Sequence, residues 1–279
     1  MRDPEVRQAE RLAAAYLDLV DDLLPGRVEG FYVVGSAALG AFDADHSDVD
    51  FIAVLDRPLG RDEVRKLRVA HRRSAGVSVL RNVARGRLAI PETCNGAYVC
   101  LDDLTRPVSK IVPVASHTGV KFFSGQGFDV NPVMWQVLAT RGVALRGPAP
   151  DTLGLDTEPE LLRSWNLANL ESYWRSWAES GLRSRRLQPA LQSTRWAVSW
   201  GVLGAPRLHR TIASGDIISK EQAGAYALAT FDPRWHPIIE EGLAFRRSQP
   251  VVAAAGNASL RRRRAAEFVL EVVRSAADL

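Results

Sequence analysis

Two short apolar runs near the N-terminus constrain the fold more than any other feature of the sequence. Residues 31–34 (FYVV) end at a glycine, and residues 49–55 (VDFIAVL) follow an aspartate. Such runs are too short for a typical helix and are typical of buried strands. Residues 77–80 and 97–101 are weaker strand candidates, and residues 61–73 have a helical composition. Strands interleaved with helices predict an α/β or α+β domain.

The middle of the chain predicts a domain boundary. The 279 residues exceed the length of a typical domain, and residues 147–150 read Gly-Pro-Ala-Pro, which no regular element tolerates. We therefore expect one domain over residues 1–150 and a second over residues 151–279. The second is helical, with apolar stripes at Leu162, Trp165, Asn169, Tyr173, Trp177 and at Trp196, Trp200, Leu203. Its tryptophans are expected to pack in a helical core, and a ligand-stacking wall is the alternative.

A glycine turn and two aspartates lie where the first two strands end and begin. Gly35 lets the backbone approach a ligand closely, and Ser36 adds a hydroxyl donor and can cap the helix that follows. The free N–H groups of a helix N-terminus attract phosphate. Alternation along a strand places Asp48 and Asp50 on one face and Val49 on the other.

The paired carboxylates predict a metal site. Two adjacent carboxylates repel each other without a cation, and their hard oxygens suit Mg²⁺ that is bound to substrate phosphates. Two such metals can stabilise the attacking and leaving oxygens of an in-line displacement. The alternative interpretation is a strand edge with solvated aspartates beside an ordinary turn.

The pattern Gly35-Ser36 … Ser47-Asp48-Val49-Asp50 resembles the signature of DNA polymerase β-type nucleotidyltransferases. The fuller resemblance is to their aminoglycoside adenylyltransferase branch, the streptomycin and spectinomycin resistance type. It extends to residues 142–148 (GVALRGP) and 213–220 (ASGDIISK). The resemblance implies an α+β fold: an N-terminal polymerase β-like nucleotidyltransferase domain, with a mixed sheet and flanking helices, and a C-terminal α-helical bundle.

The resemblance also implies roles for individual residues. Ser36, Ser47 and Lys220 would contact ATP phosphates beside Gly35, and Asp48 and Asp50 would hold Mg²⁺. A lysine on a flexible stem that reaches across from the second domain would bind phosphate and hold the cleft closed. The alternative for Lys220 is an exposed lysine at a helix start.

The sequence departs from the family at the acceptor side. The family places a third carboxylate on a later strand as general base, and that position here is Asn95. An amide cannot accept a proton near neutral pH, and losing a general base costs about 10²–10⁴-fold in rate. Glu92 is the alternative base if the loop at Pro91 shifts the register. Ala197 falls near the position of the carboxylate that family members direct at streptomycin.

Composition excludes several other classes of protein. The sequence has no apolar run long enough for a membrane helix, and its two cysteines, Cys94 and Cys100, form no disulfide framework. We therefore expect a cytoplasmic protein. The net charge of +4 is compatible with a phosphate-bearing ligand and too small to demand a nucleic-acid partner. The run Arg261–Arg264 is expected to be solvated helix surface.

These observations predict a Mg²⁺-dependent enzyme that moves AMP from ATP to a hydroxyl of a small polar acceptor, such as an aminoglycoside. Antibiotic resistance would follow from that activity. The alternatives are a nucleotide-binding homologue with impaired or no transferase activity, and a transferase that acts on a non-antibiotic acceptor. The expected protein is a monomer with no membrane or nucleic-acid partner.

Overall fold

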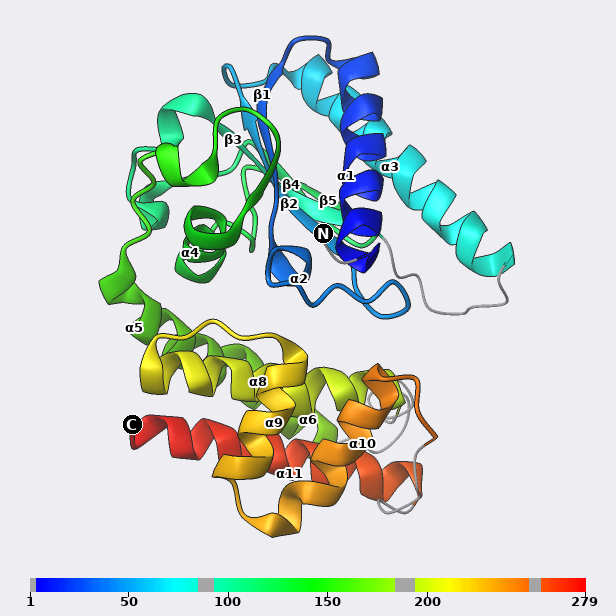
Figure 1. The fold of residues 1–279 in the computed structure, drawn as a ribbon, viewed down its shortest axis with the longest axis vertical. Coiled ribbons are helices and arrows are strands. Elements are labelled where there is room, and N and C mark those ends of the chain that lie inside the picture. Colours follow the sequence, from blue (N-terminus) through cyan, green and yellow to red (C-terminus); the bar gives the residue numbers. More distant parts are fainter. Residues whose placement is uncertain (1–3, 85–92, 184–193, 251–256) are drawn as a thin grey trace. The chain divides into compact units, whose positions relative to one another are not determined.

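The computed structural model describes residues 4–84, 93–183, 194–250 and 257–279 (Figure 1). The chain divides into two compact units, Met1–Pro159 and Glu160–Leu279. The boundary proposed at residue 150 lies inside the first unit, shortly before this division. In the described part of the chain, none of the helices has the length and apolar character that crossing a membrane requires.

The first unit is built on a mixed sheet of six strands in the order β5-β4-β3-β2-β1-β6. Strands β2 and β3 are parallel, and the other neighbouring pairs are antiparallel. The mixed sheet expected from the family resemblance is therefore confirmed. The strands are β1 (Val28–Val33), β2 (Val49–Leu55), β3 (Cys94–Cys100), β4 (Ala115–Thr118), β5 (Lys121–Ser124) and β6 (Val143–Arg146).

Helices cover both faces of this sheet. Figure 1 shows α1 and α3 on one side of it and α4 on the other. The helices of the first unit are α1 (Pro4–Leu23), α2 (Gly35–Ala38), α3 (Arg61–Ala84) and α4 (Pro132–Arg141), with short 3₁₀ turns at Leu101–Asp103, Val108–Lys110 and Pro150–Thr152.

The weak strand expected at residues 77–80 is wrong, because these residues continue α3. Val77 and Leu80 are 53% and 71% exposed, so the apolar run does not mark a buried strand. A run this short cannot be assigned by periodicity alone. No proline interrupts α3 after Arg61, and the helix therefore continues to Ala84.

A stack of aromatic rings joins α1 to the sheet. Phe51 of β2 stacks on Phe31 of β1 with ring centroids 4.6 Å apart, and Tyr16 of α1 lies 5.2 Å from Phe51. All three side chains are buried. Because strand side chains alternate, this core turns Asp50 and Ile52 to the opposite face of β2.

A buried polar cluster lies within this core. The Tyr16 hydroxyl is 2.8 Å from both the Tyr98 hydroxyl and His117 Nε2, and the His117 ring stacks on His71 at 4.1 Å. Burial, and next the neighbouring His71, lower the pKa of His117 to about 3. Burial also lowers the pKa of His71. Both imidazoles are therefore neutral in the folded protein at physiological pH.

These two histidines predict acid sensitivity of the first unit. An unfolded imidazole has a pKa near 6.5, so below that pH the unfolded chain binds protons that the folded chain excludes. The free energy of unfolding should fall as the pH decreases from 6.5 towards 3, by about 1.4 kcal/mol per pH unit from His117, and His71 should contribute in the same direction. Hydrogen exchange of β3 peptides as a function of pH measures this slope. His117→Gln should reduce the slope, and an unchanged slope would contradict the assignment.

The second unit is wholly helical in its described residues, which confirms the expected C-terminal helical fold. Helix α8 packs against α9, α10 and α11, and α11 also packs against α6. The elements are α5 (Pro159–Asn169), a π-helical turn (Leu170–Trp174), α6 (Arg175–Arg183), α8 (Arg195–Ser214), α9 (Lys220–Thr230), a 3₁₀ turn (Pro233–Trp235), α10 (His236–Arg246) and α11 (Ala258–Ala277).

Tryptophans of this unit have different environments. Trp174 is buried against α8, where a Cβ on Gly204 would lie 2.3 Å from its ring, so α8 needs a residue without a side chain there. This agrees with the expected core packing. Trp196 and Tyr173 are instead 53% and 49% exposed.

The predicted stripe from Leu162 to Trp177 is partly wrong. The residues buried along this segment are Leu162, Asn166, Leu170, Trp174 and Ala178. An apolar count does not include the polar Asn166, although its side chain is buried. Its amide can be buried because it donates a hydrogen bond of 2.7 Å to the Leu162 carbonyl. A satisfied polar group can occupy a core position that an apolar count excludes.

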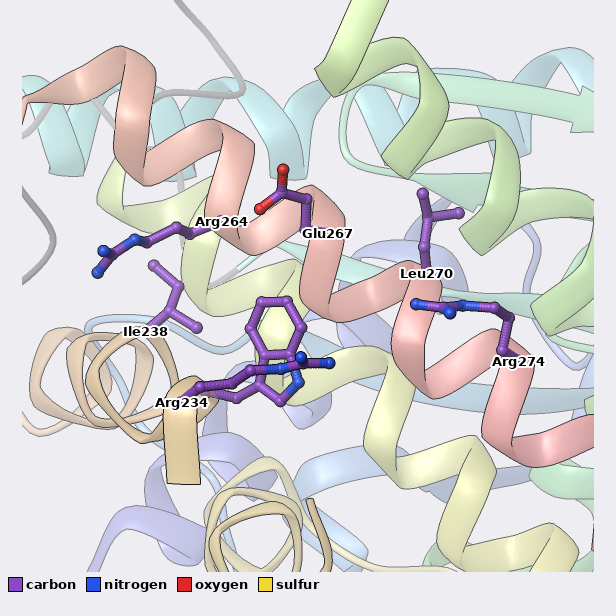
Figure 2. Close-up of a pocket in the computed structure, with 7 residues that line it drawn as sticks. Arg234, Ile238, Arg264, Glu267, Leu270 and Arg274 are labelled. Atoms are coloured by element: carbon purple, nitrogen blue, oxygen red, sulfur yellow. The ribbon is translucent and has the colours of Figure 1, made fainter. Parts of the chain in front are cut away.

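An open basic groove of about 560 Å³ lies between α11 and the segment that enters α10 (Figure 2). Its lining residues are Arg234, Trp235, Ile238, Arg264, Glu267, Leu270 and Arg274, none of them a site residue predicted from the sequence. Arg274 and Arg234 lie 2.6 and 3.6 Å from Glu271. Two of the arginines that line the groove are therefore paired with Glu271, which lies just outside the lining.

The arginine run at the start of α11 is not uniformly solvated. Arg261 forms an ion pair with the buried Glu241, and its side chain is only 19% exposed. Arg263 is exposed and pairs with Glu267 at 2.7 Å. The expectation of a solvated surface holds for Arg263 and fails for Arg261, because α10 places a buried carboxylate beside it.

Candidate active site

Asp50 lies directly against the turn that follows β1. It is the second residue of β2, and its carbonyl accepts a hydrogen bond of 2.9 Å from the Val34 N–H. A Cβ on Gly35 would lie 2.0 Å from Asp50 Oδ2, and Gly35 has φ +61°. Both the left-handed backbone and the contact with the carboxylate require glycine at this position.

Ser36 lies in the first turn of α2. The helix begins at Gly35 with Val34 at its N-cap and no side-chain cap, so the prediction that Ser36 caps the helix is wrong. The physical reason is that the left-handed Gly35 starts the turn one residue earlier. Ser36 is half-buried. Because the N-cap is Val34, the Ser36 hydroxyl is not the cap of α2.

Asp48 accepts hydrogen bonds from Thr93, just before β3, and from Asn95, the second residue of β3. Its Oδ1 accepts hydrogen bonds from the Thr93 hydroxyl at 2.7 Å and from the Thr93 N–H at 3.1 Å. Its Oδ2 accepts one from Asn95 Nδ2 at 3.0 Å. Hydrogen bonds of this kind favour the ionised carboxylate.

Asn95, the residue predicted at the position of the family's base, lies beside Asp48 and Asp50. It is the register partner of Asp50 in the parallel β2–β3 pair. Its Oδ1 accepts a hydrogen bond of 2.7 Å from the Gly119 N–H, while its Nδ2 donates to Asp48. Because a backbone N–H only donates and a carboxylate only accepts, these two partners determine the orientation of the amide.

Ser47 closes the turn before Asp48. Its hydroxyl accepts a hydrogen bond of 3.2 Å from the Asp43 N–H, and its own N–H donates to the Asp43 carbonyl at 2.7 Å. His46 Nδ1 lies 2.9 Å from Asp43 Oδ2 in the same turn. Ser47 is buried, so the structure gives it a role in shaping the chain that leads to Asp48. Phosphate binding by Ser47 stays a prediction.

Two further residues were predicted for this site, and their contact with it stays a prediction. Glu92 lies outside the described residues. Lys220 belongs to the second unit, where it is the first residue of α9 and its Nζ lies 4.8 Å above the Trp200 ring. That cation–π contact makes it more than an exposed lysine at a helix start. Its contact with nucleotide phosphates stays a prediction.

Cys94 lies close to the aspartates but offers no nucleophile. Burial, and next the negative charges of Asp48 and Asp50, raise the pKa of its thiol to about 12. A thiol with such a pKa stays protonated at neutral pH and is unreactive. Both cysteines are free and buried, as the sequence indicated.

The donor set of this cluster suits Mg²⁺ only if the substrate completes the coordination. Across the described ranges, no group of three or more His, Cys, Asp or Glu side chains is arranged to hold a metal ion. Asp48 and Asp50 supply two carboxylates, and Mg²⁺ is commonly held by one or two carboxylates together with substrate phosphates and water. The residues therefore fit a nucleotide-bound Mg²⁺ better than an all-protein site.

Thr93 and Gly119 are the residues of this cluster that sequence reasoning missed. Thr93 carried a signal, because parallel pairing of β2 with β3 places the residues around Asn95 opposite those around Asp50. Gly119 acts through its backbone N–H, which every residue except proline supplies, so the sequence carried no sign of its contact.

Comparison with known proteins agrees with this geometry. Residues 15–80 match the family described as Nucleotidyltransferase domain, and this segment includes Gly35, Asp48 and Asp50. The matched segment lies within the first unit. No curated protein matches the sequence.

A solved structure has the same fold over almost the whole chain. It is that of spectinomycin adenyltransferase AAD(9) from Enterococcus faecialis, crystallised with ATP and spectinomycin, and it aligns with a TM-score of 0.64 at 13% sequence identity. The alignment covers 94% of this chain and 99% of that one. The polymerase β-like fold expected from the resemblance is thereby confirmed.

A glycine substitution tests the contact between the turn and Asp50. Gly35→Ala should displace the Asp50 carboxylate and also strain the backbone, so Mg²⁺-nucleotide affinity should fall by tenfold or more, on the order of 1.4 kcal/mol. Gly40→Ala is the matched control, because Gly40 has φ +67° and an added Cβ would meet nothing within 4 Å.

Thermal unfolding and calorimetry with Mg-ATP measure the two effects separately. Both variants should lose about 1 kcal/mol of stability or more from backbone strain, and only Gly35→Ala should lose nucleotide affinity. Equal affinities in the two variants would show that the Asp50 contact has no part in binding.

Proposed function

We propose that this nucleotidyltransferase moves AMP from Mg-ATP to a hydroxyl of a small polar acceptor of the aminoglycoside class. The observation that carries the proposal is the pair Asp48 and Asp50 against the Gly35-Ser36 turn, within a nucleotidyltransferase domain. The fold match to an adenyltransferase crystallised with ATP and spectinomycin supports the choice of nucleotide and acceptor. Antibiotic resistance, a cytoplasmic location and a monomeric state belong to the same proposal.

Each part of the site has a distinct task in this proposal. Asp48 and Asp50 hold Mg²⁺, which when bound neutralises charge on the ATP phosphates and on the leaving pyrophosphate. The left-handed Gly35 brings the backbone close to the phosphates, and the Ser36 hydroxyl donates to them. Catalysis then depends mainly on positioning the acceptor hydroxyl in line with the leaving group.

The acceptor side supports a second candidate function, a nucleotide-binding protein with little or no transfer. The side chain at the expected base position is an amide whose oxygen and nitrogen are both hydrogen-bonded, to Gly119 and Asp48. Asn95 therefore does not act as the base. If the protein transfers AMP, the base is another residue, and Glu92 is the first candidate.

One assay separates the two candidates. The protein is incubated with Mg-ATP and a panel of aminoglycosides, and the products are identified by mass spectrometry while pyrophosphate release is followed. Transfer predicts an acceptor heavier by one AMP unit, and Glu92→Gln should then lower the rate by about 10²-fold or more. ATP binding without pyrophosphate release would support the second candidate, and absence of ATP binding would refute both.

Lys220 gives a further prediction about the nucleotide. If its ammonium contacts the β- or γ-phosphate, Lys220→Ala should weaken ATP binding about tenfold while AMP binding changes little, because AMP lacks those phosphates. Calorimetry with both nucleotides measures this. The control is Lys121→Ala, which removes an exposed lysine of β5 in the first unit. An equal effect of Lys220→Ala on ATP and AMP would place Lys220 outside the phosphate site.

A further inference from the structure

The basic groove of the second unit contains two arginines that share one carboxylate. Arg274 Nη2 lies 2.6 Å from Glu271 Oε2, and Arg234 Nη2 lies 3.6 Å from the same oxygen. Figure 2 shows these two arginine side chains pointing towards each other. Because both nitrogens lie near one oxygen, a single anionic group can contact both guanidiniums, as guanidiniums commonly do with carboxylates and phosphates.

Positive charge exceeds negative charge in and around this groove. Three of the seven lining residues are arginines, and Glu267 is the acidic one. Glu267 is itself paired with Arg263 at 2.7 Å, and Glu271 is shared between two arginines. Over residues 160–279, arginine and lysine outnumber aspartate and glutamate, whereas the reverse holds over residues 1–159. The net positive charge of the chain therefore comes from the second unit, where it attracts anions.

Apolar side chains line the groove beside the arginines. Trp235 and Leu270 are partly exposed, and the Arg234 guanidinium lies over the Trp235 ring at 4.8 Å from its centroid. The indole N–H of Trp235 is buried and has no hydrogen-bond acceptor among the described residues, although buried donors are normally paired. These features suit a ligand that combines an apolar body with hydrogen-bond acceptors.

The size of the groove favours an organic ligand over a bare ion. Its volume of about 560 Å³ lies within the range of small-molecule sites. An inorganic anion between the two arginines would leave most of this volume unused and would make no use of Trp235 or Leu270. The groove therefore has room for a body of aromatic or aliphatic carbon next to the anionic group.

We propose that this groove binds a small phosphate monoester with an apolar body. The phosphate lies between Arg234 and Arg274, and the apolar body contacts Trp235 and Leu270. A phosphate monoester carries about −1.5 to −2 charges at pH 7, which offsets the excess of guanidiniums, and arginine suits its planar two-point recognition. The site goes beyond the proposed function, because all of its residues belong to the second unit and none was predicted for the transfer reaction.

Isothermal titration calorimetry of the full-length protein with phenyl phosphate tests the proposal. Inorganic phosphate supplies the anionic group alone, and phenol supplies the ring alone. Phenyl phosphate should bind at least about tenfold more tightly than either, because only phenyl phosphate contacts both the arginines and the apolar side chains.

Two substitutions should change this affinity in opposite directions. Arg274→Gln removes a guanidinium and should weaken phenyl phosphate binding about tenfold. Glu271→Gln removes the carboxylate that competes for both arginines, and should strengthen binding about threefold or more. Arg195→Gln is the matched control, because it removes an exposed arginine of the same unit that does not line the groove, and it should leave the affinity unchanged.

Equal affinities for phenyl phosphate and inorganic phosphate would overturn the proposal, because they would indicate attraction by surface charge alone. A loss in Arg274→Gln no larger than in Arg195→Gln, or an affinity in Glu271→Gln that does not rise, would also overturn it. Thermal unfolding shows that the variants are folded, and a gain in affinity cannot result from loss of structure. None of these results bears on the proposed function, whose residues these substitutions leave unchanged.

Discussion

The parallel pairing of β2 with β3 is the constraint on which the candidate site depends. Its register places Asp50 beside Asn95 and Phe51 beside Gly96. A Cβ on Gly96 would lie 2.2 Å from the Phe51 carbonyl, so this register requires a residue without a side chain opposite Phe51. A shift of one residue would turn Phe51 out of the aromatic core and Asp50 into it. The apolar face of β2 therefore determines where its carboxylates point.

The same pairing moderates the repulsion between the two aspartates. Asp48 accepts three hydrogen bonds from Thr93 and Asn95, and Asp50 lies against the turn at Gly35. Hydrogen bonds to a carboxylate favour its charged form and spread its negative charge over the donors. A strand that carries Asp-x-Asp is consequently compatible with a stable fold.

Much of the fold was predictable because it follows from local patterns. The runs around Phe31 and Phe51 are short and apolar, as buried strands typically are, and the glycine and aspartates at their ends mark a turn and a polar edge. The predictions of buried faces failed where a polar side chain is buried or an apolar side chain is exposed. Asn166 is polar and buried, and Leu80 is apolar and exposed, so apolar counting misassigned both segments.

The sequence by itself determined that Gly35, Asp48 and Asp50 lie on one short strand–turn–helix–strand segment, and strand alternation predicts that the two aspartates share a face. Only the tertiary structure decided what surrounds Asp48. Thr93 and Asn95 reach it through pairing between strands that are distant in sequence, and Gly119 orients Asn95 through a backbone N–H. Such contacts depend on register and on main-chain geometry, which side-chain identities do not encode locally.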